Sequence, residues 1–369
     1  MNTISSPRYP HLNLVDWPFR LLPVRGQMSV WAGRQQLKNQ VEQLVRRLGR
    51  NSVSSLHLMW ADFGAGKTHT LYYMEPLARA HSLFPVYVEW PKKTSNFVDV
   101  YRGIANHFSL RVLSQLFWRC CEVKGVDKVI ESATQEFPDF GAILERLYEH
   151  DETPLIHEWL RAQPGVGKRE LVQIGVRNPI RTSDDAIRSL VILVGLVACS
   201  GDYVKLLLML DEFQRVDHLV PRIRRDVNTG IRTLLNACPE SLSIILSFSF
   251  GKPENIRFLL PEDVMTLADL ESIKLPQMTE KESMEFVADL LKNYRCHEAV
   301  EPLFPFTEES CQAILGKVGK LTPRRIMKRF IVVLRRADED IEGGVISCIM
   351  PEYALKVLRE TPVTDEEED

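Results

Sequence analysis

The chain has 369 residues, of which 45% are hydrophobic and 26% are charged, and its formal net charge is −3 at pH 7. This composition is typical of a soluble globular protein with one large or two modest domains, and the charge excludes a wholly basic nucleic-acid coat. The longest apolar run, residues 190–199, is too short to cross a bilayer, so the sequence predicts no membrane-spanning segment.

The hydrophobic pattern predicts alternating helices and strands in the first part of the chain. Residues 1–30 contain four prolines and are predicted to form an irregular arm. The elements expected after the arm are a helix over 35–48, a strand over 55–60, a helix over 67–80, a strand over 85–90 and a helix over 98–108. Residues 110–182 have a helical pattern with breaks at prolines and no evident strand.

The second part continues the alternation and then becomes helical. The elements expected here are a helix over 183–198, a strand over 204–210, a helix over 227–237 and a strand over 242–250, followed by helices after residue 278. The strand over 204–210 is almost continuously apolar, as expected for a strand buried on both faces. Strands that alternate with helices predict an α/β fold with a parallel sheet flanked by helices.

Residues 61–68, A-D-F-G-A-G-K-T, follow an apolar strand and open a helix, which is the context of a phosphate-binding loop. The motif G-x-x-x-x-G-K-[ST] has glycine where this chain has Ala61. Backbone N–H groups would hold a phosphate, Lys67 would reach the β/γ oxygens and the Thr68 hydroxyl would hold Mg²⁺. The residues expected to contact the nucleotide are Ala61, Asp62, Phe63, Gly64, Ala65, Gly66, Lys67, Thr68 and His69.

A second G-x-G-K segment, residues 165–168, serves as an internal comparison. No apolar strand precedes it, and Arg169 stands where the hydroxyl residue belongs. The sequence therefore predicts a loop between helices there and no phosphate chemistry.

Two acidic residues, Asp211 and Glu212, end the apolar strand over 204–210. The carboxyl end of a parallel strand is where α/β proteins bind ligands. We expect Asp211 to order the Mg²⁺ ligands and Glu212 to polarise the attacking water. An acidic turn at a strand end is the simpler alternative.

These motifs resemble those of AAA+ ATPases of the initiator-like branch, which includes origin-recognition, transposition-regulator and BREX-type phage-defence ATPases. Residues 31–37, W-A-G-R-Q-Q-L, resemble the segment that lines the adenine pocket, which implies that Gly33 and Arg34 bind the nucleotide. Residues 16–19, D-W-P-F, resemble the Pro-Phe pair before it. Residues 210–214, L-D-E-F-Q, resemble the D-E-x-Q form of transposition regulators.

The resemblance implies two further catalytic residues. Ser249 or Ser247 stands at the position of the sensor-1 polar residue, although the family more often has Asn or Thr there. Residues 319–325, G-K-L-T-P-R-R, resemble the sensor-2 motif with one extra residue, so Arg324, or alternatively Arg325, would reach the phosphates. Arginines that could act in trans on a neighbouring subunit are Arg257, Arg222, Arg224 and Arg225, and the sequence does not select among them.

The resemblance covers about residues 16–110 and 183–358, and it implies the domain organisation. The expected parts are an N-terminal arm (1–30), an α/β nucleotide-binding domain (31–277) with a helical insertion (110–182), a helical lid (278–360) and a disordered acidic tail (361–369).

Charge and cysteine content bear on partners and location. Eight basic and two acidic residues lie in 1–50, and eight basic and no acidic residues lie in 317–336. These stretches are either solvated helix faces or surfaces for nucleic acid. The seven cysteines form no C-x-x-C pair, which indicates buried thiols in a reducing cytoplasm rather than disulfides or a zinc site.

The leading hypothesis is therefore a cytoplasmic AAA+ ATPase. It would bind and hydrolyse ATP with Mg²⁺ as a homo-oligomer and act on DNA and a partner protein, in phage defence or mobile-element biology. The alternative is a signalling or scaffold NTPase that uses ATP as a switch to assemble a protein effector, without binding nucleic acid.

Overall fold

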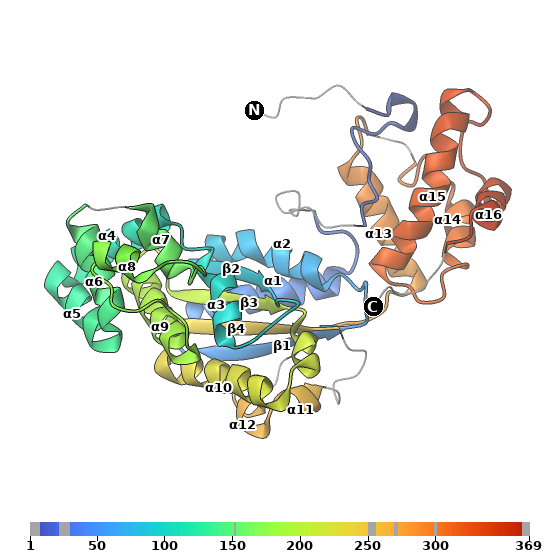
Figure 1. Ribbon diagram of the computed structural model, residues 1–369. Coiled ribbons are helices and arrows are strands. Elements are labelled where there is room, and N and C mark those ends of the chain that lie inside the picture. The colour runs from blue at the N-terminus through green and yellow to red at the C-terminus, as the bar shows by residue number, and fades with distance from the viewer. Residues whose placement is uncertain are drawn as a thin grey trace. The chain divides into compact units, whose positions relative to one another are not determined.

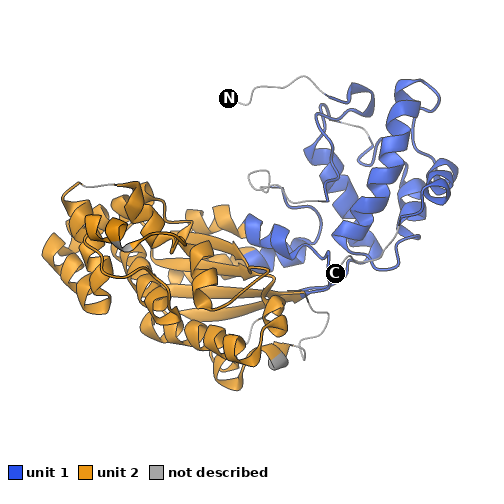
Figure 2. Ribbon diagram, viewed as in Figure 1, with its two compact units in different colours: residues 1–41, 61–73, 275–369 blue, residues 42–60, 74–274 orange. Residues whose placement is uncertain are grey.

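The computed structural model describes residues 8–21, 30–150, 153–249, 256–268, 272–298 and 301–363, except for the side chains of residues 168, 257 and 258 (Figure 1). The chain divides into two compact units (Figure 2). Unit 1 contains residues 1–41, 61–73 and 275–369, and unit 2 contains residues 42–60 and 74–274. Each unit has its own hydrophobic core.

Unit 2 is built on a five-stranded sheet with the order β2-β3-β4-β1-β5. The strands are β1 (Ser55–Ala61), β2 (Leu83–Glu89), β3 (Lys205–Asp211), β4 (Leu242–Phe248) and β5 (Ile273–Leu275). The pairs β2–β3, β3–β4 and β1–β4 are parallel. Parallel strands end at the same edge of a sheet, so the carboxyl ends of β1, β3 and β4 lie at one edge.

Strand β3 is buried along its whole length, which explains its continuous apolar sequence. Leu206, Leu208 and Leu210 face the main core, and Leu207 and Met209 on the opposite face are equally buried. The sequence prediction of a central buried strand is confirmed.

Three helices pack together against one face of the sheet: α3 (Phe97–Ala105), α9 (Ser183–Cys199) and α10 (Pro221–Ala237). Helix α9 begins at a capping box in which Thr182 and Asp185 satisfy each other's backbone N–H groups. The last turns of α1 (Gln35–Arg50) and α2 (Lys67–Ala80), which belong to this unit, lie on the opposite side of the sheet from α10 (Figure 1).

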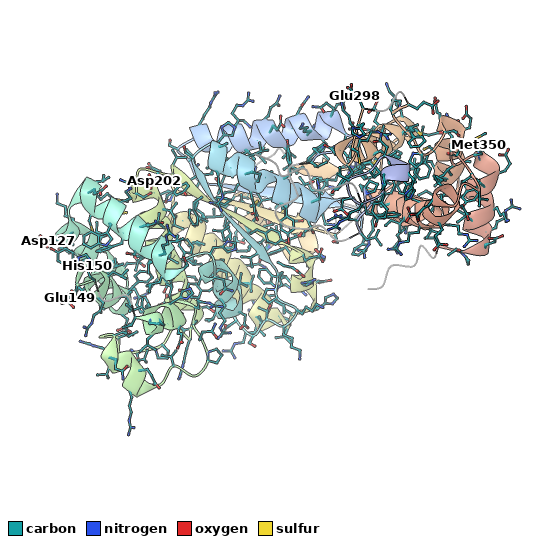
Figure 3. The ribbon with its side chains drawn as sticks, turned by 90° about the horizontal axis from the view of Figure 1, so that it is seen from above. Asp127, Glu149, His150, Asp202, Glu298 and Met350 are labelled. Carbon is teal, nitrogen blue, oxygen red and sulfur yellow. The ribbon has the colours of Figure 1, made fainter. Side chains whose placement is uncertain are left out.

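Between α3 and α9 the described residues form a helical segment and contain no strand. Its helices are α4 (Leu110–Lys124), α5 (Val126–Glu136), α6 (Pro138–Tyr148), α7 (Pro154–Leu160) and α8 (Lys168–Gln173). Asp127 and Glu149, at the ends of α5 and α6, are exposed at its outer margin (Figure 3). The second G-x-G-K segment follows α7 with no strand before it, as predicted, and its Lys168 begins α8.

The described part of unit 1 contains the helices α13 (Glu280–Asn293), α14 (Glu308–Leu315), α15 (Pro323–Glu342) and α16 (Pro351–Glu360). The N-terminal arm joins their core. Phe19 is buried against Phe330, with ring centroids 5.5 Å apart, and the Val15 N–H donates to the Tyr294 carbonyl at 2.8 Å. The arm includes a short 3-10 helix, η1 (Pro10–Leu12).

Several boundaries differ from the sequence prediction. Helix α10 starts at Pro221 rather than at 227, because proline at the first helical position needs no backbone hydrogen bond. Strand β4 ends at Phe248, and the short helices α11 (Ile256–Leu259) and α12 (Glu262–Met265) were not predicted. The acidic residues 365–369 lie outside the described part of the chain. No helix in the described part is long and apolar enough to cross a membrane.

Candidate functional site

The loop between β1 and α2 has the backbone that a phosphate-binding turn requires. Gly64 and Gly66 have φ values of 74° and 97°, in the left-handed region that favours glycine. Ala61 is the last residue of β1, where the extended backbone accepts any residue. A glycine is therefore not needed at position 61, which accounts for the departure from the motif. Lys67 and Thr68 are the first two residues of α2, and Lys67 is buried.

Arg34 holds this loop through main-chain carbonyls. Its Nη1 donates to the Ala65 carbonyl at 2.8 Å, and its Nη2 donates to the Pro276 carbonyl. The side chain is buried, and desolvation lowers its pKa to about 10, partly offset by Glu282. The guanidinium is thus still charged at neutral pH. These bonds engage two of its nitrogens with protein carbonyls.

Residues near and within the helical part of unit 1 also contact the loop. Gln277 Nε2 donates to Asp62 Oδ2 at 3.1 Å, and the Arg324 N–H donates to the Gly64 carbonyl at 3.2 Å. The Arg324 guanidinium lies 4.9 Å from the centre of the Phe63 ring, within the range of a cation–π interaction. The sequence assigned Asp62 and Phe63 only to the nucleotide, and their contacts with Gln277 and Arg324 depend on tertiary structure.

Beside the loop, two buried donors of the segment 322–324 have no hydrogen-bond partner among the described residues: Thr322 Oγ1 and Arg324 Nε. These residues lie close against the loop, because a Cβ placed on Gly64 would lie 2.9 Å from Arg324 Cβ and 3.6 Å from Thr322 Oγ1. A buried donor without an acceptor is costly, and a phosphate oxygen is an acceptor that could satisfy it. The loop and its surroundings therefore fit a phosphate group. Thr322 was not among the predicted site residues.

The segment expected to line the adenine pocket lies against the first turns of α2. The Trp31 ring packs edge-on against Tyr73 at 4.8 Å, and His69 Nε2 lies 3.1 Å from the Val30 carbonyl. Burial lowers the pKa of His69, which favours the neutral ring. Gly33 has a φ of 60°, and a Cβ there would crowd Phe286 at 3.1 Å. The glycine is thus required by the packing of this segment.

Asp211 is buried at the end of β3. Its Oδ2 accepts a hydrogen bond from the Tyr87 hydroxyl at 3.1 Å, and its Oδ1 accepts from the Glu212 N–H at 2.9 Å. These bonds fix the carboxylate at the carboxyl edge of the sheet, where β1 also ends. A buried carboxylate oriented in this way is a suitable ligand for a hard cation such as Mg²⁺.

Glu212 has a strained backbone with φ 57° and ψ 34°. A non-glycine residue in the left-handed region costs roughly 1–3 kcal/mol and persists only where its surroundings enforce it. Both carboxylate oxygens have polar partners: Gln214 Nε2 at 2.8 Å from Oε2 and Ser249 Oγ at 3.4 Å from Oε1. Arg215 Nη2 lies 3.8 Å from Oε2.

These contacts distinguish the two candidate serines. Ser249 follows β4 and its hydroxyl lies against Glu212, whereas Ser247 is fully buried within β4 and its hydroxyl has no partner among the described residues. Gln214 and Arg215 were not predicted as site residues. The D-E-x-Q resemblance singled out Gln214, but its contact with Ser249 connects two distant segments and could not be read from spacing.

The arginines considered for action in trans are distributed over α10 and α11. Arg224 Nη2 pairs with Asp217 Oδ1 at 3.1 Å, and Arg222 and Arg225 are exposed at the start of α10. The side chain of Arg257 lies outside the described part of the chain. Among the described residues, no group of three or more His, Cys, Asp or Glu side chains could hold a metal ion. Cys296 and His297 accordingly form no such group.

No protein-family model and no curated protein matches the chain. Among solved structures, it is similar to the ORC2 protein of Aeropyrum pernix, with a TM-score of 0.55 and 14% identity over 98% of this chain and 73% of that one. Weaker similarities are to Cdc6p of Pyrobaculum aerophilum (TM-score 0.48, 17% identity, 94% and 71% covered) and to A. pernix ORC1 (0.47, 14%, 92% and 68%). The two weaker scores are too low to support a conclusion about this chain.

The similarity to ORC2 agrees with the parallel sheet and the helical C-terminal part described above, and at this identity it concerns the fold alone. The α/β fold with a parallel sheet flanked by helices, which the sequence predicted, is confirmed. The C-terminal part of the described chain is helical, as the sequence also predicted.

Proposed function

We propose that the protein binds and hydrolyses ATP with Mg²⁺. The observation that carries the proposal is the loop 61–68 with its left-handed glycines. Beside it lie two buried donors of residues 322–324 that have no partner among the described residues, Thr322 Oγ1 and Arg324 Nε. The A. pernix ORC2 protein, which has the same fold, was solved as ADPNP–ADP complexes, and this supports a nucleotide as the ligand.

In this proposal the roles of the residues follow from their chemistry. The N–H groups of the loop and Lys67 hold the phosphates, because the first amides of a helix have no acceptor within the helix. Thr68 and Asp211 orient the metal ion, and Glu212 orients the attacking water. Arg324 contacts the phosphates, while Gly33, Arg34 and His69 shape the base-binding side. A bound magnesium ion would neutralise part of the phosphate charge.

We further propose that ATP drives an oligomeric switch or motor in the cytoplasm that acts on nucleic acid and a partner protein. The support for nucleic acid is a local run of basic residues in unit 1. Helix α15 and the turn before it carry basic residues at 317, 320, 325, 328, 335 and 336, with no acidic residue between 317 and 336.

The assignment to phage defence or mobile elements rests on the motif resemblance. The division into arm, α/β domain with insertion, lid and tail is proposed on the same basis.

Two substitutions test the ATPase proposal. Lys67→Ala should lose ATP affinity, and Glu212→Gln should keep ATP affinity while hydrolysis falls by about 10²–10⁴-fold, the usual effect of removing a general base. Binding of a fluorescent ATP analogue and phosphate release measure the two effects separately. Lys168→Ala, in the second G-x-G-K segment, is the matched control and should change neither. Unchanged turnover in Glu212→Gln would contradict the assignment of Glu212.

A further inference from the structure

Gln214 connects two strand ends through both ends of its amide. Its Nε2 donates to Glu212 Oε2 at 2.8 Å, and its Oε1 accepts from the Ser249 N–H at 3.0 Å. The amide orientation is fixed by this chemistry. A flipped amide would set a carbonyl oxygen against a carboxylate and an NH₂ group against an N–H, so both contacts would be repulsive.

The segment that carries Gln214 is itself rigidly held. Gln214 lies in the 3-10 helix η2 (Phe213–His218), whose first residue is buried. The Phe213 ring packs edge-on between Trp90 at 4.9 Å and Phe248 at 5.5 Å. Because Trp90 follows β2 and Phe248 ends β4, these contacts position η2 at the carboxyl edge of the sheet.

A second side chain of η2, that of Arg215, lies near the same carboxylate but is held mainly by other contacts. Arg215 Nη1 donates to the Trp90 carbonyl at 2.5 Å, and its Nη2 pairs with Glu89 Oε1 at 2.8 Å. These shorter contacts hold Arg215 mainly to the end of β2, and its distance to Glu212 Oε2 is 3.8 Å. Gln214 therefore provides the closest polar contact that the structure gives the Glu212 carboxylate.

We infer that Gln214 is the positioning residue for Glu212, and that it sets the direction of that carboxylate by linking it to the main chain of Ser249. The inference rests on the proposed ATPase function. The left-handed backbone of Glu212 alone does not determine where the carboxylate points, because the side chain has three rotatable bonds beyond it. The Gln214 bridge ties the carboxylate to the end of β4. A shift of Ser249 would thus be transmitted directly to Glu212.

The test is a double-mutant cycle with separate measurements of kcat, KM and ATP affinity. Gln214→Ala should lower kcat by about 10- to 100-fold, because misplacing a catalytic group by about 1 Å costs up to about 10²-fold, while ATP affinity stays unchanged. Gln214→Glu keeps the size of the side chain, cannot donate to Glu212 when ionised, and should lower kcat at least as far. In the Glu212→Gln background, Gln214→Ala should cause no further loss.

The matched control is Gln135→Ala. Gln135 Nε2 also contacts a glutamate, Glu131 Oε1 at 3.3 Å, but on the exposed face of α5. This variant should hydrolyse ATP as the unmodified protein does. Melting temperatures of all variants report whether they are folded.

The outcomes separate the two proposals. If Glu212→Gln loses hydrolysis but both Gln214 variants keep kcat, the positioning role is wrong and the ATPase proposal stands. An additional loss from Gln214→Ala in the Glu212→Gln background would also overturn the inference, because Gln214 would then act independently of Glu212. If the unmodified protein neither binds nor hydrolyses ATP, both proposals fail.

Discussion

Arg34 is a buried residue that supports the loop 61–68, a structural role that the sequence did not indicate. Motif resemblance placed it at the base-binding side, and the structure adds two main-chain contacts, at Ala65 in the loop and at Pro276. Its own backbone has a φ of 47°, next to the left-handed Gly33. Two consecutive residues in the left-handed region indicate that surrounding contacts enforce this turn.

We expect Arg34→Ala to destabilise the protein by about 3 kcal/mol, because it removes two charge-assisted hydrogen bonds of about 1.5 kcal/mol each. Urea unfolding followed by circular dichroism measures the change in the free energy of unfolding. Arg34→Lys keeps the charge but not the planar fork of donors, so an intermediate loss is expected. Arg46→Ala, on the exposed side of α1, is the control. A change as small as that of Arg46→Ala would contradict a supporting role for Arg34.

The residues of the site were predictable to different extents. Lys67, Thr68, Asp211 and Glu212 lie within local motifs whose spacing a sequence displays directly. The contact of Phe63 with Arg324 joins segments distant in the chain and depends on how they pack. Sequence spacing does not determine such contacts, so the supporting residues Thr322, Gln214 and Arg215 were missed as site residues.

At the scale of secondary-structure elements, the prediction was most accurate where a long periodic pattern was bounded by clear signals. Helices α1, α2 and α9 and strands β1 and β3 agree with it to within two residues at each end. The start of α10 was predicted too late because its first turn, P-R-I-R, is polar and has little hydrophobic periodicity. The elements α11, α12 and β5 are only three or four residues long, too short for periodicity to reveal.

Helix α15 is the element for which the nucleic-acid proposal makes a quantitative prediction. Lys328 and Arg335 lie seven residues apart, about two turns, so they share one side of the helix, and Lys320 lies in the turn before it. Replacing all three by Glu should weaken DNA binding. It should also reduce the slope of log affinity against log salt by roughly 0.9 for each phosphate that the protein no longer neutralises.

The experiment is a fluorescence anisotropy titration with duplex DNA at several salt concentrations. The control is Lys281→Glu, because Lys281 is an exposed lysine on α13 beside Glu285. If binding is insensitive to salt, or if the α15 variant binds as tightly as the control, this surface does not bind DNA. ATP-dependent assembly without any DNA binding would favour the alternative of a scaffold NTPase.

At the scale of the whole molecule, the proposed ATPase should act as an oligomer, because an arginine from a neighbouring subunit can stabilise the charge that develops at the transferred phosphate. The exposed Arg222 and Arg225 at the start of α10 are available for such a contact. Multi-angle light scattering should therefore give a larger mass with ATP than without nucleotide, most clearly in Glu212→Gln, which retains ATP. A monomeric mass under all conditions, together with full hydrolysis, would contradict this expectation.

The position of helices α4–α8 has a consequence for the order in which the protein folds. Strands β2 and β3 are neighbours in the sheet, yet the chain between Glu89 and Lys205 contains the whole of α3 to α9. Closing so long a connection lowers the entropy of the chain before the pairing of β2 with β3 stabilises it. Contacts between residues far apart in sequence therefore form slowly. Contacts such as those between α5 and α6 are local in sequence and can form early. Once formed, helices α4–α8 would bring the two ends of this connection closer together and so reduce the entropy cost of pairing β2 with β3.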